Sequence, residues 1–104
     1  MAVTVNVSPA VVAMDAGTTT DVTVNVQRMI DGPGDYRISG RSYGEGISAA
    51  PVSGKFAADG SATSTVAIKV AQSERDGYYP LVLTTEAGKG DRTFMLLVAV
   101  GGSG

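Results

Sequence analysis

The sequence DGYYPLVLTTEAGKGDRTFMLLVAV, residues 76–100, consists of two runs of alternating side chains around a Gly-Lys-Gly turn. Successive side chains of a β-strand point to opposite faces, so a period of two predicts strands rather than helices. Glycine adopts the backbone angles of tight turns, and residues 86–91 are therefore predicted to join the two strands as a hairpin. The predicted inward row is formed by large apolar residues: Tyr79, Leu81, Leu83, Phe94, Leu96, Val98 and Val100.

The opposite face of this predicted hairpin is also apolar in part. Met95 and Leu97 alternate with the inward row and fall on the face that should meet water. In an antiparallel sheet with one solvated side, that face is normally polar. We therefore expect a loop or a neighbouring domain to cover Met95 and Leu97.

The same alternation recurs along the rest of the chain, and no window carries an apolar stripe with helical spacing. Strands are predicted over residues 3–7, with residues 11–14 as a short continuation, over residues 21–27 and 36–42, and after the turn at residues 59–60, with one short edge strand within residues 43–54. Their predicted inward residues are mostly apolar: Val3, Val5, Val7, Val22, Val24, Val26, Tyr36, Ile38, Val66, Ile68 and Val70. About seven short strands with turn signals between them predict an all-β, antiparallel β-sandwich, and a small closed barrel is the alternative.

The composition limits the chemistry that is available. The 104 residues include no Cys and no His, and the net charge is −2. A disulfide framework, a thiolate zinc site, a thiol nucleophile and a Ser-His-Asp triad are excluded, whereas carboxylate- or Lys-based chemistry is not. The charge argues against nucleic acid as a partner, and no apolar run reaches the ~18–20 residues that span a membrane. We expect a chain that is not an enzyme, with no cofactor, no metal and no membrane insertion.

The length predicts one domain. Residues 3–100 are expected to form it, and we expect it to be monomeric. Residues 1–2 are interpreted as an expression start on an excised domain, and GGSG at 101–104 as a flexible linker or an expression tail. Both interpretations indicate a piece of a longer protein.

Three segments resemble bacterial immunoglobulin-like and fibronectin type III-like domains. These domains usually end in Gly-x-Tyr, an alternating strand, a Gly-rich hairpin and a strand closing in Val-x-Val, which here correspond to residues 77–79 and 98–100. Residues 3–27 resemble the first two strands of the family, and residues 56–70 resemble its later central strand. The disulfide and the Trp of antibody domains are missing, and Pro80 interrupts the penultimate strand.

The resemblance implies an immunoglobulin-like, Greek-key sandwich of about seven strands. It also implies a module of the kind attached to secreted glycosidases and bacterial surface proteins, and hence an extracellular or cell-surface location. Tyr79 matches the tyrosine-corner position of the family, where the ring is buried and the hydroxyl bonds to nearby backbone.

Four residues are candidate ligand contacts. Tyr43, Glu45 and nearby Arg41 combine an aromatic ring, a carboxylate and a guanidinium in one loop region, and Tyr78 adds a second ring. Such a combination could contact a carbohydrate, although exposed loop tyrosines are common without any ligand. The DGPGD stretch at residues 31–35 is the best metal candidate, but it lacks the alternating carboxylates of a calcium loop, and we interpret it as a solvated turn.

The sequence therefore predicts a non-catalytic accessory or structural module of a larger secreted or cell-surface bacterial protein, with a carbohydrate-active enzyme as the expected parent. It would act as a spacer or packing domain, and its partners would be neighbouring domains of the same chain. The alternative is a carbohydrate-binding or adhesive module that contacts polysaccharide through loop tyrosines. A second alternative is an engineered β-sandwich scaffold.

Overall fold

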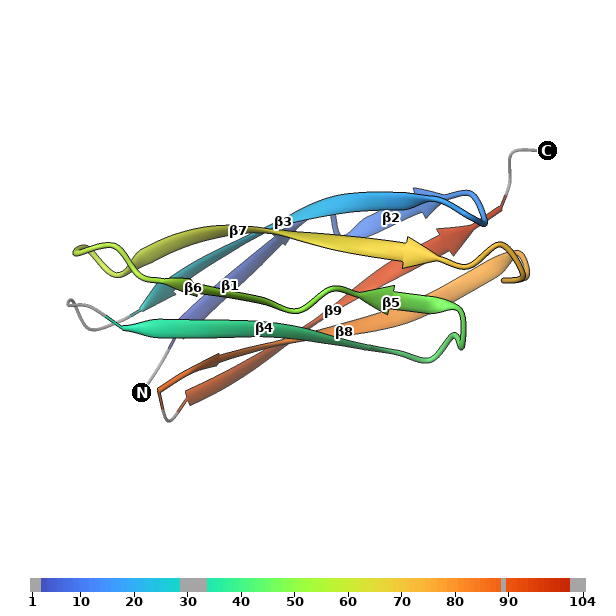
Figure 1. Cartoon of the computed structure of the whole chain (residues 1–104). Helices are drawn as coiled ribbons and strands as arrows, with labels where there is room; N and C mark the ends of the chain where they lie inside the picture. Colours follow the sequence, from blue (N-terminus) through green and yellow to red (C-terminus); the bar gives the residue numbers. More distant parts are fainter. Residues whose placement is uncertain (1–2, 29–33, 89, 102–104) are drawn as a thin grey trace.

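The computed structural model describes residues 3–28, 34–88 and 90–101, and within them the chain is built from β-strands (Figure 1). The strands are β1 (Val3–Ser8), β2 (Val11–Met14), β3 (Thr19–Arg28), β4 (Asp35–Ser42), β5 (Ile47–Ala49), β6 (Val52–Lys55), β7 (Ser61–Val70), β8 (Gly77–Ala87) and β9 (Gly90–Val100). In these described residues no helix is long and apolar enough to cross a membrane.

The strands form two layers that pack face to face along a common long axis (Figure 1). One sheet has the order β1-β3-β7-β5 and the other the order β2-β9-β8-β4-β6. The predicted all-β, two-layer architecture is therefore confirmed, but the predicted number of about seven strands is wrong, because the described residues form nine.

Two breaks at proline account for the additional strands. β1 and β2 are separated at Pro9, and β5 and β6 at Pro51; at each break the chain moves from the four-stranded to the five-stranded sheet. Proline has no amide hydrogen to donate to a ladder, so a strand interrupted by proline at a sheet edge is free to change partners. The single edge strand predicted within residues 43–54 is therefore two strands in different sheets.

One pairing contradicts the prediction of a wholly antiparallel sandwich. β2 runs parallel to β9, with Val12 opposite Val98 and Met14 opposite Val100. The reason is the crossover at Pro9, since β2 then runs along β9 in the same direction and extends the five-stranded sheet. The other strand pairs of the described residues are antiparallel.

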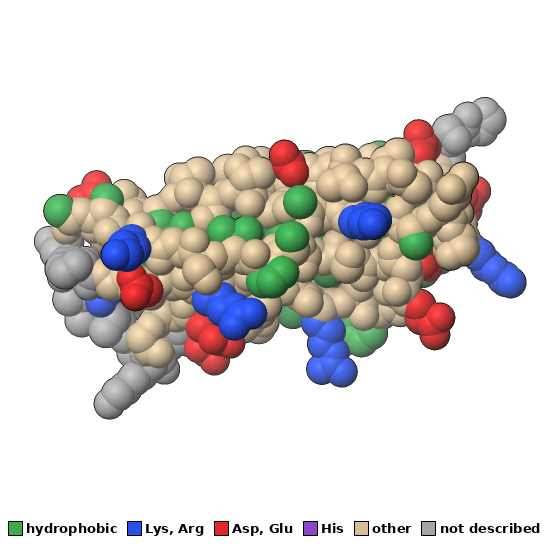
Figure 2. All heavy atoms as spheres, viewed as in Figure 1, with side chains coloured by type: hydrophobic (Ala, Val, Ile, Leu, Met, Phe, Trp, Pro, Cys, Tyr) green, Lys and Arg blue, Asp and Glu red, His purple; other side chains and the backbone are tan. Residues whose placement is uncertain are grey.

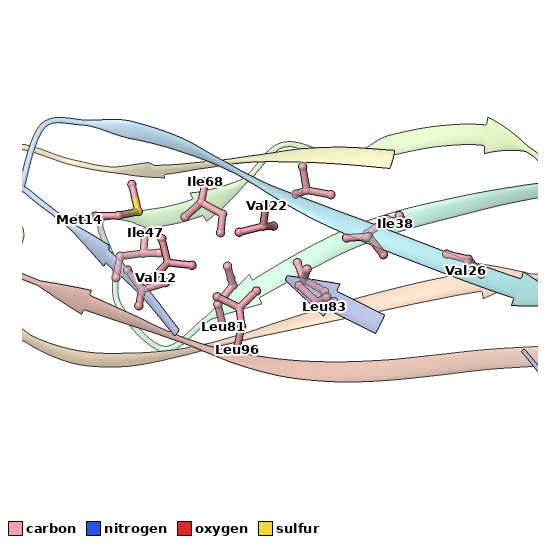
Figure 3. Close-up of a cluster of buried hydrophobic side chains, with 14 of the residues drawn as sticks. Val12, Met14, Val22, Val26, Ile38, Ile47, Ile68, Leu81, Leu83 and Leu96 are labelled. Carbon is pink, nitrogen blue, oxygen red and sulfur yellow. The ribbon is translucent and has the colours of Figure 1, made fainter. Parts of the chain in front are cut away.

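The predicted hairpin is present as β8 and β9, paired from Gly77 opposite Val100 to Ala87 opposite Gly90. Its inward row packs against inward residues of the other sheet, including Val22, Val26 and Ile68, in one continuous core (Figure 3). Three predicted inward residues, Val5, Tyr79 and Phe94, are only half-buried and pack at the margin of this core. The core residues with at most 1% exposure come from both layers: Val3, Val22, Val24, Ile38, Val66, Ile68, Val70, Leu81, Leu83, Leu96 and Val98.

A buried polar contact links the two sheets near one end of the core. The hydroxyl of Tyr36 on β4 is hydrogen-bonded to the hydroxyl of Ser64 on β7, and both side chains are buried. The Tyr36 ring also packs against Phe56, with the ring centroids 5.1 Å apart and the planes tilted by 51°. This hydrogen bond fixes the position of one sheet relative to the other at this point, in addition to the apolar packing between them.

Another buried hydroxyl lacks a partner. Thr85 on β8 is 1% exposed, and its Oγ1 has no hydrogen-bond partner among the described residues. Burying an unpaired polar group is unfavourable, and a methyl group of similar size removes that penalty.

We expect Thr85→Val to raise the free energy of unfolding by about 1 kcal/mol in urea denaturation. Thr84→Val, on the outer face of the same strand, should change it by less than about 0.5 kcal/mol. Lower stability in Thr85→Val would contradict this.

Candidate functional site

The four predicted ligand contacts lie near the same end of the five-stranded sheet but on two different surfaces. Tyr43 follows β4 directly, and its amide donates to the carbonyl of Pro80 on β8 at 3.4 Å. Glu45 lies in the exposed turn between β4 and β5, and Arg41 and Tyr78 lie on β4 and β8 themselves. Tyr43 and Tyr78 are 75% and 73% exposed.

Tyr43 and Glu45 border a shallow hollow at the end of the sandwich. Its volume is about 320 Å³, and its walls are the turns at residues 43–46 and 73–75 together with Tyr79. The two turns are tied together, because the Gly46 amide donates to Glu74 Oε2 at 2.7 Å and the Ala71 amide donates to the Gly46 carbonyl at 2.7 Å. Arg41 and Tyr78 do not line this hollow.

Tyr79 lines the hollow, but its hydroxyl is already bonded to the backbone of the protein. Its hydroxyl donates to the carbonyl of Arg75 at 2.8 Å, which confirms the hydroxyl-to-backbone bond that the resemblance implied. Its ring is half-buried at the margin of the core. Burial raises the pKa of Tyr79, and the neighbouring Glu74 carboxylate raises it further, so the hydroxyl stays protonated as a donor at neutral pH.

Arg41 and Tyr78 belong to the outer face of the five-stranded sheet, where the strand register places Arg41 opposite Val82 and Tyr78 opposite Ala99. Three of the large apolar residues that are most exposed lie on this face: Val11, Tyr78 and Met95, at 57%, 73% and 62%. We call the following residues the apolar outer face: Val11, Ala13, Tyr78, Pro80, Val82, Met95, Leu97 and Ala99.

The strand register arranges these residues in rows across β2, β9 and β8. One row is Val11, Leu97 and Pro80, and the next is Ala13, Ala99 and Tyr78. Neighbouring strands lie about 4.8 Å apart, so members of a row are in reach of one another. The sequence predicted Met95 and Leu97 as apolar residues on an outer face, but it did not predict Val11. The signal that could have shown it is that Val11 alternates with Val12, which is buried.

In the described chain no loop covers Met95. A loop was one of the two structures expected to cover it, and a neighbouring domain was the other. Leu97 is half-buried, because β2 pairs alongside it through the bond from the Leu97 amide to the Ala10 carbonyl at 2.9 Å. Met95 lies beyond the pairing of β2 and remains 62% exposed. Leu97 is thus shielded by a neighbouring strand of its own sheet and not by the loop that was expected.

Charged groups of both signs lie beside one another on β4, β6 and β8, where Asp35, Arg37, Lys55 and Glu86 line a hollow of about 530 Å³. Figure 2 shows Lys and Arg side chains scattered singly among Asp and Glu side chains over this view of the molecule. No group of three or more His, Cys, Asp or Glu side chains is placed to hold a metal ion within the described ranges. Of the DGPGD stretch, residues 31–33 lie outside the described residues, as do residues 1–2 and 102–104.

Comparison with known proteins gives likenesses of structure only. No protein-family model matches the sequence, and no curated protein matches it. The structure is similar to domains 4 and 5 of the S-layer protein SbsC, with a TM-score of 0.60 and 15% identity over 93% of this chain and 50% of that chain. It is also similar to a family 123 glycoside hydrolase from Clostridium perfringens, with a TM-score of 0.66 and 10% identity over 95% of this chain and 27% of that chain.

A third similar structure is the BIgI domain of the beta protein from S. agalactiae, solved bound to CEACAM1, with a TM-score of 0.50 and 13% identity over 95% of this chain and 96% of that chain. At these identities the likeness concerns the fold alone, and it is consistent with the bacterial immunoglobulin-like sandwich that the sequence resemblance implied. The chain spans half or less of the length of the S-layer and glycoside hydrolase structures.

Proposed function

We propose that this chain is a non-catalytic module of a larger secreted or cell-surface bacterial protein, in which it packs against a neighbouring domain and fixes the spacing between domains. We propose further that it is an immunoglobulin-like sandwich with Greek-key connections. The apolar outer face carries the proposal. Support comes from the fold, which is similar to parts of an S-layer protein and of a glycoside hydrolase.

The apolar outer face is unusual for a sheet face that meets water. A solvated sheet face is normally polar, and contiguous exposed apolar side chains mark contact surfaces. Here Val11, Tyr78 and Met95 are more than half exposed on one face, and half-buried Pro80 and Leu97 lie between them. A large, rigid aromatic side chain such as Tyr78 is typical of the anchors of protein interfaces. A neighbouring domain of the same chain is the partner that we propose.

The lack of catalytic residue types supports a non-catalytic role. The sequence has no His and no Cys, so the commonest general base and the commonest nucleophilic thiol are missing. Glycosidases use a pair of carboxylates, and Glu45 and Glu86 do not form one, because Glu45 lies in the β4–β5 turn and Glu86 near the far end of β8, at opposite ends of the sheet. We therefore propose that any activity of the parent protein resides outside this module.

The test compares this chain alone with the polypeptide extended into its natural neighbours. We expect amide signals of β2, β8 and β9 to shift and to gain protection from hydrogen exchange in the longer polypeptide. Met95→Lys should abolish that protection, since a charge would be desolvated at the contact, while leaving the isolated domain folded. Thr65→Lys, on the outer face of the other sheet, is the matched control and should have no effect. Changes confined to the first and last residues of the domain would refute the packing role.

Carbohydrate contact through tyrosines is the second candidate. The observation that favours it is the exposure of Tyr43 and Tyr78 at 75% and 73% near one end of the sheet. The Tyr43 amide donates to the carbonyl of Pro80, two residues after Tyr78, so the two tyrosines lie at the same end of the sheet. This mode places the ligand at the end of the apolar outer face.

A further inference from the structure

The outer face of the four-stranded sheet carries a feature unlike the opposite face. On three adjacent strands, β1, β3 and β7, nine outward positions in three rows are all uncharged and polar. We call them the neutral polar grid, and its rows are Thr4, Gln27 and Ser61; Asn6, Asn25 and Thr63; and Ser8, Thr23 and Thr65. From strand spacing and rise, the grid measures roughly 10 Å across and 13 Å along the strands.

The first two rows surround a shallow depression. Its volume is about 410 Å³, and it is lined by the six residues of both rows together with Val5, Val26 and Ala62. Seven of the nine side chains are exposed and two, Thr23 and Ser61, are half-buried. The surface is therefore hollowed and open to a ligand from solution.

Several of these side chains are held in place by the protein. Thr63 donates to Asn25 Oδ1 at 2.8 Å, and Gln27 Nε2 donates to the Asp59 carbonyl at 3.0 Å. The Ser61 hydroxyl donates to Asp59 Oδ1 at 2.6 Å. Short and β-branched side chains also have little rotamer freedom to lose on binding, so the grid is organised before a ligand arrives.

The grid matches the chemistry of a neutral sugar chain. Side-chain amides and hydroxyls each donate and accept hydrogen bonds, as sugar hydroxyls do. The next charged side chains on the same face, Asp21 and Lys69, lie beyond the third row, and at the other end the Asp59 carboxylate accepts bonds from the Ser61 hydroxyl and amide. An acidic glycan would meet the Asp59 carboxylate and would find no cation in the rows to pair with. Arg92, which lines a neighbouring hollow with Thr4, lies outside the rows, and its Nε donates to the Val3 carbonyl at 3.1 Å.

Other ligand classes fit this face less well. A protein partner would need apolar or aromatic anchors, and the exposed large hydrophobic side chains of the described chain are Val11, Tyr43, Tyr78 and Met95, none of which lies on these strands. Nucleic acid would need cations, which the three rows lack. We propose that the neutral polar grid is a binding site for an uncharged polysaccharide or oligosaccharide. This site does not depend on the packing function, and packing through the apolar outer face would leave it open to solvent.

The test is a titration of the whole chain, followed by amide NMR, with neutral cello-, xylo-, laminari- and malto-oligosaccharides and with oligogalacturonate as the acidic probe. We expect at least one neutral oligosaccharide, at millimolar concentration, to shift amides at residues 4–6, 25–27 and 61–63, and the acidic one to leave them unmoved. Asn25→Ala should weaken that binding about tenfold, because it removes a central amide. Asn6→Ala should do the same if Asn25→Ala impairs folding, which the urea midpoint reports.

Two controls separate this site from the alternatives. Ser48→Ala, on β5 of the same sheet but outside the grid, and Tyr78→Ala, on the opposite sheet, should leave the affinity unchanged. The proposal is overturned if no neutral oligosaccharide in the panel shifts grid amides at tens of millimolar. It is equally overturned if oligogalacturonate binds as well as the neutral chains, or if Tyr43→Ala or Tyr78→Ala abolishes binding that Asn25→Ala preserves. The sugar titration is independent of the packing proposal. Its outcomes stay the same whether or not Met95→Lys affects the packing of this domain against its neighbour.

Discussion

Leu81→Ala is expected to lower the free energy of unfolding by about 2–4 kcal/mol, the range for large aliphatic side chains removed from a closed core. Leu81 is completely buried on β8, opposite Leu96 on β9. Its removal forfeits apolar burial and leaves a cavity that two hydrogen-bonded sheets cannot readily close. Val24→Ala and Ile68→Ala, at positions with no exposure in the other sheet, should lower stability for the same reason.

The matched control is Thr23→Ala, a residue adjacent to Val24 on the outer face of its sheet. It should change stability by less than about 1 kcal/mol, because no core contact is lost. Urea unfolding measures both quantities through the midpoint and its slope. Equal losses at Leu81 and Thr23 would show that the assignment of inner and outer faces is wrong.

Gly40→Val should have the second largest effect, a loss of about 1–3 kcal/mol from overpacking. Gly40 is itself exposed, but a Cβ atom there would point toward the other sheet, 2.6 Å from the Ala49 Cβ and 3.2 Å from Leu83 Cδ2. Ala49 belongs to β5 in the other sheet, so any side chain at position 40 would force the two sheets apart at this end. Gly40→Ala should be destabilising in the same direction.

Ser39→Val tests whether the effect of Gly40→Val comes from its place between the sheets. Ser39 is on the outer side of the same strand, opposite Thr84, and its replacement should change stability by less than about 0.5 kcal/mol. A wild-type urea midpoint for Gly40→Val would mean that the sheets are not closely packed at Ala49.

Alternation in the sequence predicted which face of most strands is buried, because a period of two leaves little freedom once one face is apolar. It worked for Val22, Val24 and Val26 and for the β8–β9 hairpin, whose partners are adjacent in sequence. It could not assign β2, since four residues without a turn signal do not reveal which sheet they join. The parallel pairing with β9 depends on a contact across more than 80 residues.

The candidate surfaces were predictable only in part for a related reason. The alternation showed that Met95, Leu97 and Tyr78 are on outer positions, but their grouping with Val11 requires the β2–β9 register. Likewise, each row of the neutral polar grid combines β3 and β7, which are paired although three strands intervene in the sequence. A single sequence gives the face of each strand, whereas the neighbours on that face come from the three-dimensional register.

The parallel β2–β9 pair has a mechanical consequence. The first and last described residues lie at opposite ends of a molecule that is 48 Å long (Figure 1). A pulling force on the C-terminal end would act on β9, and an opposite force on the N-terminal end would act on β2 through β1. The two parallel strands would therefore be pulled past one another along their length, which is a shear load. The ladder between them, extended by the bonds from Leu97 to Ala10 and from Gly101 to Met14, would then bear the load all at once instead of unzipping bond by bond. A module joined this way at both ends is suited to holding its length under strain.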